Sequence, residues 1–233
     1  MNDEQILDIS VIIVNWNTRG LLQACLESVI HTVRDLKYEL IVVDNASTDG
    51  SVDMLRQEYP RVILIANAEN RGFGTANNQA LRIMRGRYAL LLNSDTVLTA
   101  GAVQGLFAFM EDHPETAMAC GQLLNRDGSK QNSFASFPNL ITLLANVPLL
   151  EYLFPRRYPS KRYDYDRPIE VDSGIGACLL VRKVAIDVVG LFDERYFFFF
   201  EETDWACAMR QAGWKIHYVP DVSIYHLQGQ SIG

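Results

Sequence analysis

The 233-residue sequence lacks several features that define large classes of proteins. No apolar run reaches the roughly 18 residues of a membrane-spanning helix, and the polar residues 1–5 do not begin a secretory signal. Basic residues are outnumbered, with 21 Lys and Arg against 28 Asp and Glu, whereas nucleic-acid binding needs a clustered basic surface. These absences predict a cytoplasmic protein that does not bind nucleic acid.

Cysteine is also scarce. The four cysteines lie far apart in the sequence, without the spacing of a zinc site or a redox motif, and each has apolar neighbours. We therefore expect free, buried thiols in a reducing compartment rather than disulfides. The four residues are Cys25, Cys120, Cys178 and Cys207.

Apolar runs and helical stripes alternate through the first half of the chain. Short β-branched runs predict strands, and apolar residues three or four positions apart predict helices. The expected strands cover 9–15, 39–44, 62–66 and 88–92, and the expected helices cover 22–33, 51–59, 75–85 and 103–110. Strands and helices that alternate at this interval form parallel βαβ units. The sequence therefore predicts an α/β fold with a Rossmann-like, mostly parallel sheet.

The pattern changes after Cys120. Residues 125–170 contain five prolines and exceed the length of a normal connection, which is typical of a functional lid or a mobile insertion. Within this stretch, 140–154 is strongly apolar and four basic residues follow, so it forms either a core-packing helix or a segment at a membrane surface. Further strands are expected at 177–181 and 214–219, and further helices at 183–189 and 201–211.

Polar residues follow the predicted strands where each strand ends. Asp95 comes after the continuous apolar run 89–92. Ligands bind at the carboxyl ends of strands in open α/β sheets, and carboxylate oxygens suit a hard divalent cation. The alternative is that Asp95 caps the next helix. For Asp44, a turn or helix cap and a ligand contact remain equally open.

Two further groups are candidates for chemistry. Residues 70–74 open a helix with glycines that permit close backbone approach, but they lack the spacing of dinucleotide-binding and phosphate-binding loops. Glu201, Glu202 and Asp204 begin another helix, where the helix dipole alone favours acids. The Phe-rich block 196–200 before them would raise the pKa of one acid towards that of a useful base. His226 is either a metal ligand or a surface residue.

Seven motifs occur in order: VIIVNWN (11–17), VVDNASTDGS (42–51), ENRGFGTANNQAL (69–81), LLLNSDT (90–96), SGIGACLLVRK (173–183), GLFDERYFFFFEETDWACAMRQAGW (190–214) and YHLQGQS (225–231). Together they resemble the family 2 inverting glycosyltransferases with the GT-A fold, and most closely the rhamnosyltransferase-like branch. The resemblance covers nearly all of the chain outside 125–170. It implies a nucleotide-sugar-binding half at 1–124, and a smaller acceptor-binding and catalytic half of the same domain at 125–233.

The resemblance also implies roles for single residues. Asp95 matches the second acid of the family's Asp-any-Asp motif, which binds a divalent metal (Mg²⁺ or Mn²⁺) on the donor diphosphate, and Asn93 replaces the first acid. His226 matches a late histidine that completes the metal or diphosphate site. Glu202 matches the catalytic base, where aspartate is usual, and Glu201 is the alternative base. The implied nucleotide-sugar-binding residues are Asn15, Asn17, Asp44, Asn45, Asn70, Arg71, Gly72, Asn77, Asn93, Ser94 and Asp95.

The expected activity follows from this resemblance. It is a metal-dependent, inverting transfer of a sugar, such as rhamnose, from a dTDP- or UDP-sugar to a hydroxyl of a glycan or lipid-linked glycan, as in cell-wall or polysaccharide biosynthesis. Peripheral contact with the inner face of the plasma membrane would suit such an acceptor. Asn93 and Glu202 depart from the usual motifs, which leaves open a nucleotide-sugar-binding protein without turnover. A nucleotidyltransferase is disfavoured because the chain lacks a Gly-rich Lys/Arg phosphate loop.

Overall fold

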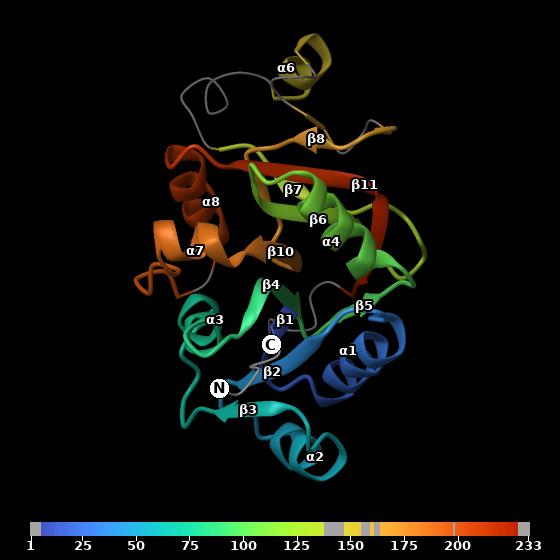
Figure 1. Cartoon of the computed structure of the whole chain (residues 1–233). Helices are drawn as coiled ribbons and strands as arrows, with labels where there is room; N and C mark the ends of the chain where they lie inside the picture. The colour runs from blue at the N-terminus through green and yellow to red at the C-terminus, as the bar shows by residue number, and fades with distance from the viewer. Residues whose placement is uncertain (1–5, 138–146, 155–158, 161–163, 198, 228–233) are drawn as a thin grey trace.

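A nine-stranded sheet forms the centre of the computed structural model, with helices on both of its faces (Figure 1). The structure describes residues 6–137, 147–154, 159–160, 164–197 and 199–227. The strand order is β3-β2-β1-β4-β10-β6-β11-β5, and β8 pairs with β11. A separate pair, β7 and β9, lies antiparallel.

The first half of the chain confirms the predicted parallel arrangement. Strands β1, β2, β3 and β4 all run parallel to one another. They span Leu7–Asn15, Tyr38–Asp44, Ile63–Ala66 and Gly86–Asn93, and the helices that connect them are α1 (Arg19–Thr32), α2 (Ser51–Glu58) and α3 (Phe73–Leu81). The third helix ends earlier than the expected 85, because the Arg85 backbone N–H instead donates to the buried Glu39 carboxylate at 2.7 Å.

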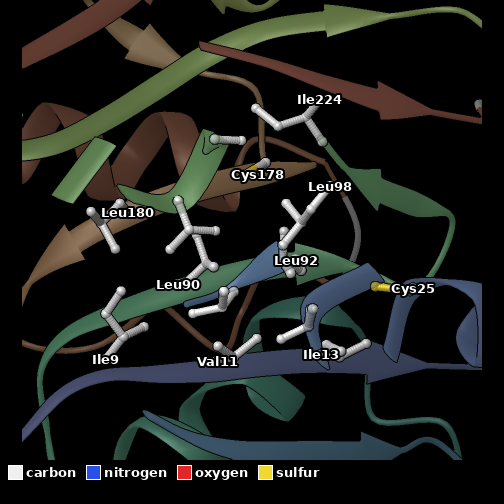
Figure 2. Packing of buried hydrophobic residues seen from close by; sticks show 14 of the residues in the cluster. Ile9, Val11, Ile13, Cys25, Leu90, Leu92, Leu98, Cys178, Leu180 and Ile224 are labelled. Carbon is white, nitrogen blue, oxygen red and sulfur yellow. The ribbon is translucent and has the colours of Figure 1, made fainter. Parts of the chain in front are cut away.

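The strands are continuously apolar because both faces of the sheet are covered. Side chains alternate between the two faces along a strand. Ile9, Val11 and Ile13 of β1 therefore pack on one face, in the core that includes α1 (Figure 2). Ile12 of the same strand and Leu91 of β4 pack in the core on the opposite face, against α3 and α8. This double cover makes the sheet a rigid support for residues at its edges.

The second half adds strands that the sequence pattern did not predict. The expected strand at 177–181 is β10 (Cys178–Arg182), which runs antiparallel between β4 and β6 (Thr116–Leu124). One long strand, β11 (Lys215–His226), extends well beyond the expected strand at 214–219, with an irregularity between Val219 and Ser223. The remaining elements are β5 (Thr96–Leu98), α4 (Ala102–Asp112), β7 (Phe134–Ala135), β8 (Ile169–Glu170), β9 (Ser173–Gly174), α7 (Lys183–Val189) and α8 (Glu201–Gln211).

The stretch 125–170 carries one described helix, α6 (Val147–Leu153), which lies apart from the main sheet at the top of Figure 1. Tyr152, Leu153 and Phe154 expose 72%, 54% and 56% of their surfaces. The core-packing interpretation is therefore wrong for the end of this helix, because these large apolar side chains face outward. The rest of the apolar run, 140–146, lies outside the described residues. Among the helices that the structure describes, none combines the length and apolar character needed to span a bilayer.

Candidate functional site

The polar ends of strands β1, β2 and β4 meet at one edge of the sheet. In the strand register, Asn15 of β1 lies opposite Asp44 of β2, and Val14 lies opposite Asn93 of β4. This edge is formed by the carboxyl ends of parallel strands, where α/β proteins bind ligands. The polar residues that follow the predicted strands therefore do meet at one edge of the sheet.

A hydrogen-bond network joins these strand ends. Asn15 Nδ2 donates to Asp44 Oδ2 at 2.8 Å, and Thr18 Oγ1 donates to Asn15 Oδ1 at 2.7 Å. The hydroxyls of Thr18 and Ser94 lie 2.8 Å apart, which connects the first and fourth strands. Asp44 Oδ1 accepts the backbone N–H of Ser47, so this carboxylate does cap the turn after β2. It still has accepting capacity for a ligand, because a carboxylate offers about four lone-pair sites.

The loop between β3 and α3 is fixed against this network. Asn45 Nδ2 donates to the carbonyl of Gly72 at 3.2 Å, and Asn70 Oδ1 accepts the Gly72 N–H at 3.0 Å. Gly72 has a φ of 80°, and a Cβ there would lie 2.5 Å from the Phe197 carbonyl oxygen. Only glycine allows this close approach between the donor-side loop and the segment before α8.

The other predicted donor-side residues differ in their surroundings. Asn17 is exposed, and its Oδ1 accepts the Thr48 N–H at 2.8 Å. Arg71 is exposed on the same loop as Gly72. Asn77 is buried, and its Nδ2 donates to the Phe73 carbonyl at 3.0 Å within α3.

Asp95 is buried, with 1% of its surface exposed, and neither carboxylate oxygen accepts a hydrogen bond. His226 Nε2 lies 3.4 Å from Asp95 Oδ1, within ion-pair range but outside hydrogen-bond geometry. The main chain fixes this juxtaposition, because His226 of β11 pairs with Thr96 of β5 and the Leu227 N–H donates to the Asp95 carbonyl. The helix-cap interpretation of Asp95 is wrong, since β5 intervenes before α4.

This pair fits a divalent cation. An ionised carboxylate without a partner is costly to bury, and a carboxylate oxygen with an imidazole nitrogen is a common set of metal ligands. Within the described residues, no group of three or more His, Cys, Asp or Glu side chains comes together. Asp95 and His226 would thus provide only two ligands, with the half-buried Asn93 two residues from the aspartate.

Glu202 of α8 lies near the short loop before β10. A Cβ at Gly176 would lie 3.8 Å from Glu202 Cγ, and the next residue, Ala177, accepts the Asn93 N–H at 3.0 Å. Residues 176–177 therefore separate Glu202 from the turn that carries Asp95. Glu202 and Asn93 thus both contact the segment 176–177, from different elements.

Burial changes the acidity of these carboxylates. It raises the pKa of Glu201 to about 7, and the charge of Glu202 adds to this shift. Burial also raises the pKa of Glu202. Glu201 Oε2 has no hydrogen-bond partner, whereas Asp204 is exposed on the first turn of α8. The raised pKa was predicted from the Phe-rich block, yet Phe197 and Phe200 are themselves about 60% exposed, so other parts of the fold cause most of the burial.

Two residues of the site surroundings were missed from the sequence. Asn78 holds the segment before α8, because its amide exchanges two 2.9 Å hydrogen bonds with the backbone of Phe192. Gln131 contacts the Nδ1 side of the His226 ring, whereas Nε2 is the nitrogen near Asp95. Asn78 adjoins the motif residue Asn77, which could have drawn attention to it. No local signal marks Gln131, whose partner lies 95 positions later.

Comparisons with known proteins agree with this architecture. The model of the family "Glycosyl transferase family 2" matches residues 10–190. The N-acetylglucosaminyl-diphospho-decaprenol L-rhamnosyltransferase of Mycobacterium tuberculosis (strain ATCC 25618 / H37Rv) is 33% identical over 210 residues, covering 83% of this chain and 68% of that protein. The poly(ribitol-phosphate) beta-glucosyltransferase of Bacillus spizizenii is 32% identical over 127 residues, covering 52% of this chain and 20% of that protein.

A solved structure supports the fold assignment. The crystal structure of GalNAc-T7 with UDP, GalNAc and Mn²⁺ has a TM-score of 0.71 at 17% identity, and the match covers 97% of this chain and 44% of that chain. A likeness at this identity carries the fold only, whereas the family match spans most of the sequence. The chain belongs to glycosyl transferase family 2, resembles its rhamnosyltransferases, and is a glycosyltransferase with the GT-A fold.

Proposed function

We propose that this enzyme is a metal-dependent, inverting glycosyltransferase that moves a sugar from a nucleoside-diphosphate donor to a hydroxyl of a glycan or lipid-linked glycan. The observation that carries the proposal is the buried carboxylate of Asp95, which has no hydrogen-bond partner and faces His226. Asp95 and His226 would hold Mg²⁺ or Mn²⁺. When bound, the cation would offset the negative charge that develops on the leaving diphosphate.

The donor-side network suits a nucleoside. The remaining lone pairs of Asp44 can accept hydrogen bonds from a base N–H or a ribose hydroxyl, and the neighbouring asparagines offer both donors and acceptors. Gly72 lets the backbone of its loop approach a ligand closely. We propose that this edge binds the nucleoside part of a dTDP- or UDP-sugar.

Glu202 is the proposed general base. Its carboxylate takes the proton from the acceptor hydroxyl as that oxygen attacks the anomeric carbon from the face opposite the diphosphate. A single displacement of this kind inverts the anomeric configuration. The raised pKa of Glu202 increases its proton affinity towards the working pH, which favours proton transfer. Glu201 is the alternative base, since one of its oxygens has no partner.

Paired variants distinguish the two glutamates. Glu202→Gln keeps the size of the side chain and removes the base, so we expect turnover to fall by about 10²-fold or more while donor binding is retained. Glu201→Gln should keep most of the activity. The reverse result would assign the base to Glu201. Donor binding without transfer or donor hydrolysis in the wild-type protein would contradict the enzyme and support a binding protein without turnover.

The sugar and acceptor are proposed by analogy with the mycobacterial relative, whose name specifies L-rhamnosyl transfer to a decaprenyl-diphosphate-linked sugar. We propose rhamnose as the transferred sugar and a polyprenyl-diphosphate-linked sugar as the acceptor. A panel of nucleotide sugars with Mn²⁺ tests the donor through thermal unfolding, because a ligand that binds only the folded state stabilises it. A larger shift with a donor other than dTDP-rhamnose would reject this assignment.

A lipid-linked acceptor would bring the enzyme to a membrane, and α6 is the proposed point of contact. Leu153 and Phe154 are more than half exposed at its end, and four basic residues lie between 156 and 162 in the sequence. The double substitution Leu153→Ser/Phe154→Ser should reduce co-sedimentation with anionic vesicles, whereas Val184→Ser on the exposed face of α7 should not. Equal sedimentation of all three proteins would reject α6 as the contact.

A further inference from the structure

Behind the predicted metal pair, a buried amide contacts His226 at two points. Gln131 exposes only 6% of its surface. Its Nε2 donates to the main-chain carbonyl of His226 at 2.6 Å and to Asn125 Oδ1 at 2.8 Å. Its Oε1 lies 2.9 Å from His226 Nδ1. One side chain therefore holds both the backbone and the ring of this histidine.

The orientation of the amide follows from the chemistry of these partners. A main-chain carbonyl only accepts hydrogen bonds, so the amide nitrogen of Gln131 must face the His226 carbonyl, and its oxygen must face Nδ1. Because an amide oxygen only accepts, Nδ1 must carry the proton. A neutral imidazole has a single N–H, so Nε2 is left with a free lone pair.

That lone pair is on the nitrogen that faces Asp95, 3.4 Å from Oδ1. Both Asp95 oxygens are buried without a hydrogen-bond partner. In this tautomer, Nε2 has no proton to donate to them. We propose that Gln131 is a positioning residue that fixes His226 as the Nδ1–H tautomer and thereby presents Nε2, beside Asp95, to a divalent cation. This inference rests on the metal site of the proposed function.

Gln131 is itself held firmly enough to act in this way. Its N–H donates to the Leu123 carbonyl at 2.8 Å, and its carbonyl accepts from Gln122 Nε2 at 2.9 Å. Gln122 in turn accepts from the Tyr218 hydroxyl. Orientation before the metal arrives matters here, because Asn93 replaces the usual first acid and Asp95 and His226 provide only two ligands. Loss of the residue that hydrogen-bonds a ligating histidine typically weakens metal affinity by about 10- to 100-fold.

The tautomer can be measured without metal or donor. ¹⁵N spectra of histidine-labelled protein at about pH 8, above the ordinary imidazole pKa, resolve the two ring nitrogens. The chain has four histidines, and the spectrum of His226→Gln assigns the signals of His226. We expect a protonated Nδ1 and an unprotonated Nε2. A protonated Nε2 would overturn the inference and leave the proposed transferase activity untouched.

Variants then test the role of Gln131. Gln131→Met removes the acceptor at nearly constant volume, so we expect a loss of the pure Nδ1–H signature and about tenfold weaker Mn²⁺ binding in the presence of UDP, measured by electron paramagnetic resonance. UDP binding without metal should be unchanged. Gln131→Glu keeps an acceptor and should keep the tautomer. Gln104→Met is the matched control, because Gln104 also donates to two main-chain carbonyls, of Thr32 and Arg34.

The outcomes separate the two levels of the proposal. Unchanged tautomer and Mn²⁺ affinity in Gln131→Met would overturn the positioning role. Equal losses in Gln131→Met and Gln104→Met would also overturn it, because the effect would then be general destabilisation. A wild-type protein with the expected tautomer but no Mn²⁺ binding would overturn the metal site, and with it the ligand role of His226.

Discussion

Asp95→Asn removes one negative charge from the buried turn after β4 and keeps the size of the side chain. Both Asp95 oxygens lack a hydrogen-bond partner, and in the proposed tautomer the nearby His226 Nε2 presents a lone pair. An asparagine amide could donate to that nitrogen. We therefore expect the substitution to stabilise the metal-free protein, although it removes a proposed metal ligand.

The size of the effect follows from the cost of an unpaired group. A buried polar group without a hydrogen bond costs about 1–3 kcal/mol, and a charged one costs more. We take about 2 kcal/mol as the gain in the free energy of unfolding. For a chain of 233 residues, the unfolding entropy is about 0.5 kcal/mol/K, so the melting temperature should rise by about 4 °C.

Thermal unfolding in EDTA, and then with Mn²⁺ and UDP, measures both sides of this prediction. The variant should melt higher than wild type in EDTA and should lose the added stabilisation by Mn²⁺. Asp44→Asn is the matched control, because Asp44 is equally buried but accepts hydrogen bonds from Asn15 and Ser47. This control should lose stability. An Asp95→Asn variant that melts lower than wild type in EDTA would refute the reasoning.

Three other predictions follow from the site. On the acid side of the pH profile, kcat/KM should fall at a higher pH than an ordinary glutamate would give, because the base must be ionised and burial raises the pKa of Glu202. A fall at the pH of an ordinary glutamate would contradict this. The pKa of Glu201 in the folded protein, about 7, lies above its ordinary 4.5. As the pH rises from about 5 to about 8, urea titrations should therefore show the wild type losing stability relative to Glu201→Gln. A relative gain in stability over this range would contradict the prediction. Gly72→Ala should lower the free energy of unfolding by about 2 kcal/mol or more and reduce sugar transfer, because its Cβ would meet the Phe197 carbonyl. Gly101→Ala is the control: Gly101 has the same φ of 80°, but no atom lies within 4 Å of its Cβ position, so this variant should lose less stability.

The sequence was sufficient to predict the parallel half of the fold. Strands such as β1 and β4 are continuously apolar because each is covered on both faces, and this pattern can be read locally. The convergence of Asn15, Asp44 and Asn93 then follows from the parallel order of the strands. The position of Asp95 near the end of β4 could be predicted for the same reason, since it follows shortly after the apolar run 89–92.

The second half could not be read in this way. The position of β10 between β4 and β6, and its antiparallel direction, are set by pairing with strands far away in the sequence. The contact between Gln131 and His226 joins positions 95 residues apart, in a stretch that looks like a loop. The sequence left two interpretations open for the apolar stretch that contains α6, because an apolar run does not show what covers it.

Hydrolysis of a nucleotide-sugar donor tests the central claim most directly, because it needs no knowledge of the acceptor. NMR spectra recorded in real time with Mn²⁺ report both the release of nucleoside diphosphate and the anomeric configuration of the first sugar released. We predict release that stops in EDTA and in Glu202→Gln, with an initial configuration opposite to that of the donor. Release that persists in EDTA, or a sugar that first appears with the configuration of the donor, would contradict a metal-dependent, inverting glycosyltransferase.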